Sequence, residues 1–358
     1  MSHPSTLDCA TWSETLAQPQ IWRRWADACD FAAHKTWIDQ QSFDEVWFCG
    51  AGTSAFIGDI IVAGLEGAPL SHRIRAVSST DLVARPQAFL HGRNPLVVSF
   101  GRSGNSSESI GTLDALDALA PTAPRLNITC NQDSTLSYRR TDATRVIILP
   151  PETHDTGFAM TSSFSTMLLT ALMLFSNGAP SAQRLIRAAD VFDQVQPLMQ
   201  ASIGPAPQRA VFLGTGAMTF AAREAALKVM ELSAGRIPCL WDSVLGFRHG
   251  PKSFVNADTD IVVFGSAEFQ VTKYERDLIE ELKLQFPASR MTTIGPDMDI
   301  DLYQPDGPVW AAPNAILYAQ LAGALWAQSM GLNVDNPFEG QGTLTRVVSG
   351  VKLYEVSV

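Results

Sequence analysis

Residues 46–52 read VWFCGAG, and residues 210–216 read AVFLGTG. In both stretches an apolar run leads directly into a Gly-x-Gly turn, which is typical of a buried parallel strand that turns sharply into a helix. The same offset of 164 residues separates the first glycines (50 and 214) and the second glycines (52 and 216). At that offset VVSFG at 97–101 falls on IVVFG at 261–265. A repeat of this length is a whole domain, so the sequence predicts a tandem duplication of one α/β unit.

Apolar runs alternate with helical stretches in both halves, which predicts a parallel sheet of about five strands with flanking helices in each. The strands expected in the first half are Val46–Cys49, Arg73–Val77, Pro95–Phe100, Arg125–Thr129 and Arg145–Leu149. Those expected in the second half are Ala210–Leu213, Ile261–Phe264, Met291–Ile294 and Pro308–Ala311. Long helices are expected from about residue 161 to 175 and from about 314 to 330.

Four segments follow from this pattern. Residues 1–40 are expected to form a helical arm, broken at Pro19, that packs on the body or on a partner subunit. Residues 41–190 form the first domain and residues 191–345 the second. Residues 346–358 are a tail, and the alternation from Thr345 to Val358 predicts an added edge strand.

Composition excludes several classes of function. The net charge of −10 argues against nucleic acid and anionic membranes, although backbone N–H groups and hydroxyls can still hold a phosphate. The five scattered cysteines match neither a disulfide framework nor a metal site. The start of the chain does not resemble a signal peptide, and the longest apolar run, 164–175, is too short to span a bilayer. We therefore expect a soluble cytoplasmic protein without a bound metal.

The two halves differ most after the strand that ends at residue 100. Residues 101–109 read GRSGNSSES, whereas the second copy has GSAEF at 265–269. The first version places four serines and two glycines within nine residues at a predicted helix start, where free N–H groups and hydroxyls favour a phosphate. The alternative is a helix N-cap with spare serines.

The turn GAGTS at 50–54 is a weaker signal. It lacks the third glycine of a dinucleotide fingerprint, and no acidic residue ends the following strand. We interpret it as a tight turn that presents Thr53 and Ser54 to a ligand; in the alternative, its glycines serve geometry alone.

Candidate acid–base residues lie in the second half. Glu224, Lys228 and Glu231 are spaced to share one face of a helix. Such a stripe is ordinarily a solvated set of ion pairs, but here its neighbours are apolar, which favours a functional role. His249 lies in a loop bounded by Gly and Pro, a place where a lone histidine is more often plain polar surface.

Together these motifs resemble the sugar isomerase (SIS) domain in tandem. The resemblance rests on GAGTS at 50–54, SFGRSGNS at 99–106 and RHGPK at 248–252. Longer stretches are similar to the AgaS group, described as D-galactosamine-6-phosphate deaminase or tagatose-6-phosphate ketose/aldose isomerase. Those stretches are 51–61, 151–163, 246–253 and 346–351.

The resemblance implies flavodoxin-like domains and a homodimer with shared active sites. It implies phosphate binding by Ser103 and Ser106 and a role for Glu231 in moving a proton between C1 and C2 of the sugar. His249, donated by the neighbouring subunit, would open the sugar ring. The other substrate-binding positions that it implies are Gly52, Thr53, Ser54, Gly104, Asn105, Thr161 and Ser162. Ser349 stands where the related glucosamine-6-phosphate synthase carries a tail lysine.

The expected reaction converts an amino-hexose 6-phosphate, D-galactosamine 6-phosphate by resemblance, into a ketohexose 6-phosphate and ammonia without a cofactor. Lys228 and Glu224 would polarise the substrate or relay protons. The alternatives are a plain aldose–ketose isomerase, a deaminase of another amino or glycated sugar phosphate, and a non-catalytic sugar-phosphate sensor. The presence of Glu231 and His249 and the lack of a basic DNA-binding segment weigh against the sensor.

Overall fold

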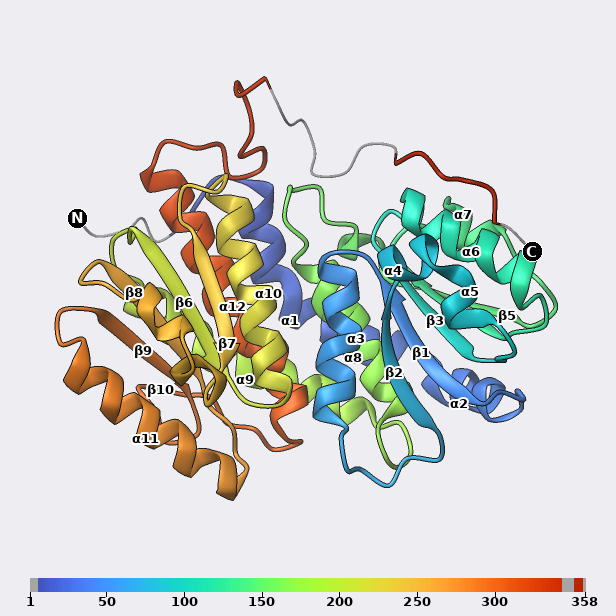
Figure 1. The fold of residues 1–358 in the computed structure, drawn as a ribbon, viewed down its shortest axis with the longest axis horizontal. Helices are drawn as coiled ribbons and strands as arrows, with labels where there is room; N and C mark the ends of the chain where they lie inside the picture. The colour runs from blue at the N-terminus through green and yellow to red at the C-terminus, as the bar shows by residue number, and fades with distance from the viewer. Residues whose placement is uncertain (1–5, 343–350, 357–358) are drawn as a thin grey trace. The chain divides into compact units, whose positions relative to one another are not determined.

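The computed structural model describes residues 6–342 and 351–356 of the chain. These residues form two compact units, each built around one sheet (Figure 1). The β1–β5 unit takes its residues from 24–154, 162–182 and 346–358. The β6–β10 unit takes its residues from 1–23, 155–161 and 183–345.

The β1–β5 unit contains a parallel sheet of five strands in the order β2-β1-β3-β4-β5. The strands are β1 Glu45–Gly50, β2 Arg73–Ser78, β3 Leu96–Gly101, β4 Arg125–Thr129 and β5 Thr144–Ile148. The helices are α2 Phe31–Asp39, α3 Thr53–Gly64, α4 Ser79–Ala84, α5 Pro86–Leu90, α6 Ser107–Leu119, α7 Thr135–Tyr138 and α8 Ser162–Phe175, with the short 3-10 helix η1 Pro151–Thr153. All five predicted strands and the predicted long helix are confirmed, within a residue or two at their ends.

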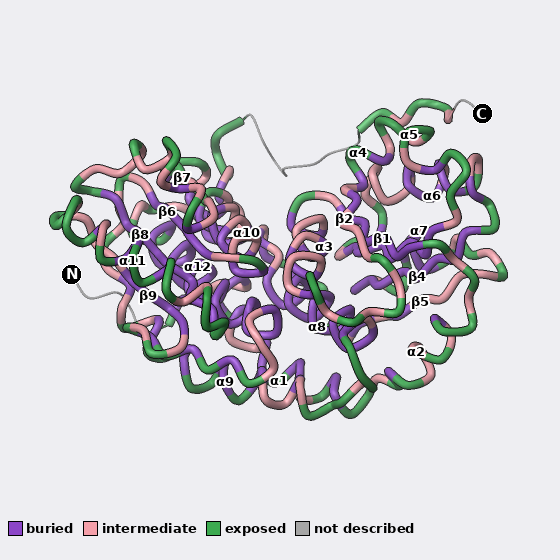
Figure 2. The backbone as a smooth tube through the Cα atoms, turned by 60° about the horizontal axis from the view of Figure 1, so that its bottom comes forward, coloured by how far each residue is buried: buried purple, intermediate pink, exposed green. Residues whose placement is uncertain are grey.

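Helices cover both faces of this sheet, which explains why its central strands are apolar throughout. On one face Trp47 of β1 and Val97 of β3 pack with Leu116 of α6 in a single cluster. On the other face Phe48 meets Phe175 of α8 edge to face at 5.1 Å. Figure 2 shows the resulting continuous burial along the central strands.

The β6–β10 unit repeats the design. Its sheet has the order β10-β9-β8-β6-β7. Read from the β7 edge, this is the order of the first sheet with each strand replaced by its duplicate. The strands are β6 Arg209–Gly214, β7 Cys239–Ser243, β8 Thr259–Phe264, β9 Arg290–Gly295 and β10 Ile300–Asp301. The helices are α9 Ala182–Ser202, α10 Ala217–Leu232, α11 Phe269–Gln285 and α12 Pro308–Ser329, with the 3-10 helices η2 Gly246–Arg248 and η3 Pro251–Phe254.

The duplication is visible in the backbone of the two glycine turns. Gly52 has φ 56° and ψ −131°, and Gly216 has φ 59° and ψ −126°, a left-handed region that favours glycine. A Cβ on Gly50 would lie 2.5 Å from the backbone of Ser54, and one on Gly214 would lie 2.4 Å from the carbonyl oxygen of Met218. Both glycines of each turn are therefore required by geometry.

The arm prediction is confirmed as helix, but the predicted break at Pro19 is wrong. Helix α1 runs without interruption over Ala10–Ala28. An interior proline removes one backbone N–H and leaves the carbonyl four residues earlier without its donor. The side chain of Gln18 replaces that donor, since its Nε2 donates to the Thr15 carbonyl oxygen at 2.8 Å. The arm packs on α9, where Trp22 meets Phe192 at 5.7 Å.

Two strand predictions in the second half need correction. Residues Pro308–Ala311 are not a strand but the first turn of α12, which begins with a proline after Gly307 at φ 93°. The fifth strand is instead β10, only two residues long. Strand β7 was not predicted, because it is a half-exposed edge strand without an apolar run.

The predicted edge strand in the tail is also wrong for the described residues 351–356. Residues 351–356 have no strand pairing. They lie instead along α4–α6, where Leu353 approaches Gly111 and Val356 packs against the apolar cluster of that face. Residues 345–350 and 357–358 of that prediction lie outside the described part of the chain. In the described residues no helix is long and apolar enough to cross a membrane.

Candidate functional site

The first candidate region lies at the carboxyl edge of the β1–β5 sheet. Strands β1 and β3 are parallel neighbours, with Cys49 opposite Ser99, so the loops that follow them leave from the same edge. The chain turns to opposite sides of the sheet at this pair. In open α/β sheets ligands bind outside the strand ends at such a switch point.

The loop after β1 starts α3 with two hydroxyl residues. Thr53 and Ser54 are its first residues and are only 5% and 6% exposed. The glycines before them are required by the geometry of the turn, as the simpler of the two interpretations of this sequence held. Contact of the two hydroxyls with a ligand stays a prediction.

The loop after β3 is held from the neighbouring strand. Asn105 Oδ1 accepts from the backbone N–H of Thr135 at 2.8 Å and from its hydroxyl at 3.0 Å. Asn131 Nδ2 donates to the Ser103 carbonyl oxygen at 3.1 Å. Gly104 has φ 63°, and a Cβ there would lie 2.4 Å from the Ser134 hydroxyl. Backbone conformation and close packing thus both require glycine in this serine loop, residues 101–106.

Ser103 and Ser106 have different roles in this loop. Ser106 is the N-cap of α6, where its hydroxyl accepts from the Ser109 N–H at 3.1 Å, so the N-cap interpretation is correct for this residue. Ser103 is exposed, and its hydroxyl accepts from the Asn105 N–H at 3.3 Å. The first turn of α6 adds the positive end of the helix dipole. An anion at this helix start would meet backbone donors and hydroxyls together.

Asn131, Ser134 and Thr135 support the loop and were not predicted. They belong to a polar run that follows β4 at the same edge of the sheet. The position of that run, directly after a buried strand next to β3, was the available signal.

Thr161 and Ser162 lie at the start of α8. The Thr161 backbone N–H and hydroxyl both donate to the Asp155 carboxylate, at 2.8 and 3.0 Å, and Thr161 is fully buried. Ser162 is buried as the first residue of α8. Asp155 therefore has a structural role in shaping this segment.

The second candidate region is the charged triad of α10 in the β6–β10 unit. Lys228 Nζ lies 3.3 Å from Glu224 Oε1 and 2.5 Å from Glu231 Oε2, so the predicted shared face is confirmed. The triad is not a solvated stripe. Glu224 and Lys228 are fully buried, whereas 18% of the Glu231 side chain is exposed. Burial alone would lower the pKa of Lys228, but the two carboxylates outweigh it and raise that pKa, so the amine stays protonated.

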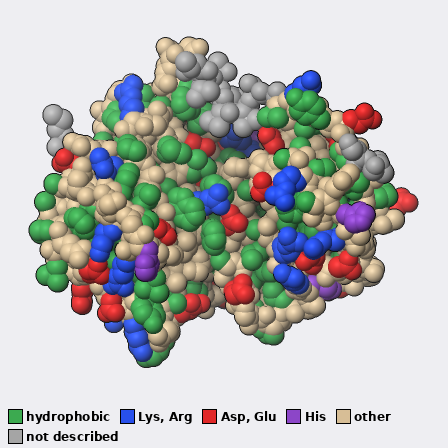
Figure 3. All heavy atoms as spheres, viewed as in Figure 1, with side chains coloured by type: hydrophobic (Ala, Val, Ile, Leu, Met, Phe, Trp, Pro, Cys, Tyr) green, Lys and Arg blue, Asp and Glu red, His purple; other side chains and the backbone are tan. Residues whose placement is uncertain are grey.

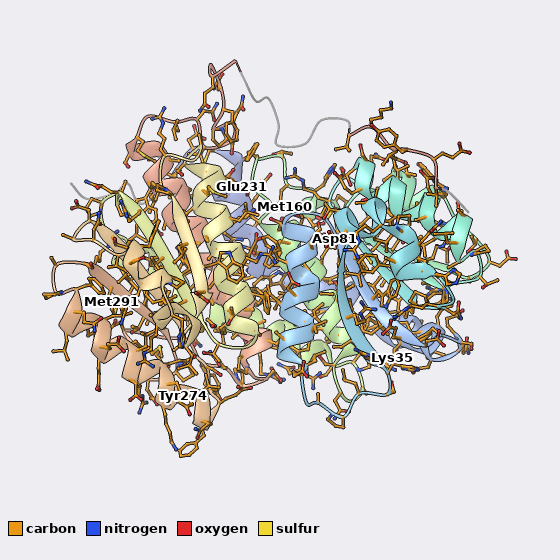
Figure 4. The ribbon with its side chains drawn as sticks, in the orientation of Figure 1. Lys35, Asp81, Met160, Glu231, Tyr274 and Met291 are labelled. Carbon is orange, nitrogen blue, oxygen red and sulfur yellow. The ribbon has the colours of Figure 1, made fainter. Side chains whose placement is uncertain are left out.

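Helix α12 accounts for the burial of the triad. It packs along α10, and its residues 309–327 are buried throughout. Gly323 allows the close approach, because a Cβ there would lie 2.9 Å from Leu232 and 3.5 Å from the Lys228 carbonyl oxygen. Figure 4 labels Glu231 near the end of α10.

His249 lies on an exposed loop between η2 and η3. The loop is fixed to α11 by Glu281, which pairs with Arg248 at 2.7 Å and with Lys252. Figure 3 shows acidic and basic side chains side by side over this unit. In the described ranges, no hydrogen bond or ion pair joins the His249 imidazole to another residue.

Glu231 and His249 are not brought together within this unit. Helix α10 starts at the carboxyl edge of its sheet, and Glu231 is fourteen residues further along, about 21 Å from the first turn. The loop of His249 leaves from the end of β7, at the edge where α10 begins. No described contact links the two side chains.

Within the part of the chain that the structure describes, no group of three or more His, Cys, Asp and Glu residues is arranged to hold a metal ion.

Fold and site together define a protein of the SIS-domain class, and a sequence model of the SIS domain matches residues 42–177. The chain is 36% identical to D-galactosamine-6-phosphate deaminase AgaS of Shewanella sp. (strain ANA-3), over 96% of this chain and 91% of the relative. It is 35% identical to the Escherichia coli protein of the same name, over 98% and 97% of the two chains. The crystal structure of tagatose-6-phosphate ketose/aldose isomerase from Escherichia coli superimposes with a TM-score of 0.87 at 33% identity, covering 97% and 96% of the two chains. The chain belongs to the AgaS family of SIS-domain proteins.

Proposed function

We propose that this protein is a phosphosugar deaminase that converts D-galactosamine 6-phosphate into tagatose 6-phosphate and ammonia. The names of the relatives support the substrate, since they match over nearly the whole chain. The observation that carries the chemistry is the triad on α10, in which Glu231 alone has solvent access beside a buried ammonium.

In this proposal the serine loop holds the phosphate. The Ser103 hydroxyl and the first turn of α6 supply donors, Ser106 caps that turn, and Gly104 and Asn105 fix the loop. Thr53 and Ser54, on the adjacent turn after Gly52, contact the sugar.

The reaction needs proton transfers and one molecule of water. His249 opens the pyranose by moving a proton between the ring oxygen and the anomeric hydroxyl. Glu231 takes the C2 proton, which is acidic because it lies next to the C1 aldehyde, and returns it to C1. The C2 amine becomes a ketimine, and water hydrolyses it to the ketone and ammonia.

Lys228 and Glu224 are positioning residues in this scheme. Because Lys228 is buried and protonated, it cannot act as a base, but it orients the Glu231 carboxylate through the 2.5 Å ion pair. Glu224 neutralises the remaining charge of the buried amine at 3.3 Å.

We further propose a homodimer in which His249 serves the site of the partner subunit. The separation of His249 from Glu231 along the β6–β10 unit supports this arrangement. A site completed by the partner accounts for an exposed histidine that no described residue binds.

The second candidate function is aldose–ketose isomerisation of a hexose 6-phosphate, which the name of the matching crystal structure supports. It uses the same two proton transfers without loss of nitrogen. A panel of hexosamine and ketose 6-phosphates, assayed for ammonia and for aldose–ketose interconversion, separates the two. Ammonia from galactosamine 6-phosphate supports the deaminase, and interconversion without ammonia would replace it with the isomerase.

A further inference from the structure

A buried carboxylate occupies the switch point of the second sheet. Glu275 is the seventh residue of α11 and is fully buried. Its Oε2 accepts the backbone N–H of Ser266 at 3.0 Å, and the nearby Thr215 hydroxyl acts to lower the pKa of this carboxylate. Its Oε1 is buried without a hydrogen-bond partner in the described residues. None of the proposed catalytic steps uses Glu275.

Ser266 and Thr215, the two residues next to the Glu275 carboxylate, correspond to the proposed phosphate region of the first sheet. Thr215 lies between Gly214, the last residue of β6, and Gly216, and Ser266 follows Gly265, which comes directly after β8. At the offset of 164 residues these positions fall on Ala51 and Arg102, in the glycine turn and the serine loop of the first sheet.

The two loops differ in how their backbone donors are used. After β3, within the described residues, no protein acceptor is found for the N–H groups of Ser103, Gly104 and Ser106. After β8 three successive N–H groups all have side-chain acceptors. The acceptors are Glu275 for Ser266, Gln304 at 2.9 Å for Ala267, and the Ser266 hydroxyl at 3.1 Å for Glu268.

The helix that follows each loop carries a different residue at the matching position. Glu275 is seven residues after the N-cap Glu268, and the residue seven after the N-cap Ser106 of α6 is Leu113, which is buried and apolar. An acidic residue at this buried helix position therefore belongs to the second copy alone.

We propose that the second sheet also carries an anion-binding cradle and that Glu275, when ionised above neutral pH, fills it as a built-in anion. The cradle consists of the Ser266 N–H, the Thr215 hydroxyl and the loop that Gln304 fixes. Its natural ligand is the Glu275 carboxylate, and a small oxyanion such as formate can take the same donors when that carboxylate is removed. The comparison with the serine loop after β3 as a second, unfilled cradle rests on the proposed function. If Glu275 fills the cradle of the second sheet, only the serine loop remains to bind a phosphate in each chain.

The test is anion rescue of the variant Glu275→Ala, followed by thermal unfolding. Removal of the carboxylate leaves the buried Ser266 N–H without its acceptor, so Tm falls. Sodium formate, compared with sodium chloride at equal ionic strength, should raise the Tm of this variant by about 3–5 °C at about ten times the formate dissociation constant. The wild type and Glu268→Ala, which alters an exposed carboxylate of the same loop, should show no formate-specific rise.

Equal formate effects in all three proteins would overturn the proposal. If Glu275→Ala does not fold, Glu275→Ser leaves a similar space and is titrated in the same way. Absence of galactosamine 6-phosphate turnover in the wild type would refute the proposed function, while formate rescue of the Glu275 variant would still stand. The two failures are therefore distinguishable.

Discussion

Replacing Lys228 with methionine removes the one cation of a buried triad. The substitution keeps the length and apolar character of the side chain, so the packing against α12 changes little. What it removes is the ammonium that lies 3.3 Å from Glu224 and 2.5 Å from Glu231. Glu224 then has to carry its charge in the protein interior or take up a proton.

The magnitude follows from these distances. At an effective dielectric constant of about 20, each contact is worth about 5–7 kcal/mol before desolvation is subtracted. Removing one partner of a buried ion pair costs about 3–5 kcal/mol in practice. We take that range as the expected loss in the free energy of unfolding, and it corresponds to a fall in Tm of roughly 10 °C. The carboxylates raise the pKa of Lys228 above its usual value, so this stabilisation is fully present below that value and is lost only in strong alkali.

Urea unfolding at neutral pH measures the loss. The matched control Lys283→Met changes an exposed lysine of α11 and should stay within about 0.5 kcal/mol of the wild type. The double variant Glu224→Gln/Lys228→Met removes the uncompensated charge as well and should recover a large part of the stability. A loss below about 1 kcal/mol in Lys228→Met, or no recovery in the double variant, would refute the assigned roles of burial and charge.

Three further predictions concern the sites themselves. Ser103→Ala should raise KM for a phosphorylated substrate far more than it lowers kcat, because it removes binding common to ground and transition states; an unchanged KM would remove Ser103 from the phosphate site. Mixing inactive Glu231→Gln with inactive His249→Ala under subunit exchange should recover about a quarter of wild-type activity, since about half of the dimers are mixed and each has one intact site. No recovery in proven heterodimers would place both residues in one chain's site. Burial raises the pKa of Glu275 to about 7 in the folded protein, with a smaller contribution from Glu268, so the folded state holds an extra proton below neutrality. Stability should therefore fall by up to about 3 kcal/mol as pH rises from about 4.5 through 7, and Glu275→Gln should abolish this dependence; an identical pH profile in that variant would exclude the titration.

Sequence patterns predicted the fold where burial and local geometry coincide. The repeated glycine turns and the apolar runs before them predicted the two parallel sheets, because strands buried on both faces must be apolar throughout. The prediction failed for Pro308–Ala311, where an equally apolar run is a helix buried on all sides. It also failed at Pro19, because the replacement donor on Gln18 is a tertiary detail that no local pattern reveals.

For the candidate site, the sequence predicted which residues share a helix face but not how far each one is buried. Helical spacing correctly put Glu224, Lys228 and Glu231 on one face, but their different exposures depend on α12, which lies about ninety residues further along the chain. Glu275 was missed because its neighbours Tyr274 and Arg276 make the segment resemble an exposed helix. Only the fold reveals that this one carboxylate points to the carboxyl edge of the second sheet.

The central claim is that Glu231 moves the proton in a deamination. Its most direct test compares wild type and Glu231→Gln on galactosamine 6-phosphate, with ammonia and tagatose 6-phosphate both quantified and substrate binding measured separately. We expect one ammonia per ketose phosphate from the wild type, and a fall in turnover of roughly 10²–10⁴ in the variant with binding retained. Ammonia release by Glu231→Gln at the wild-type rate, or no ammonia from the wild type, would contradict the account.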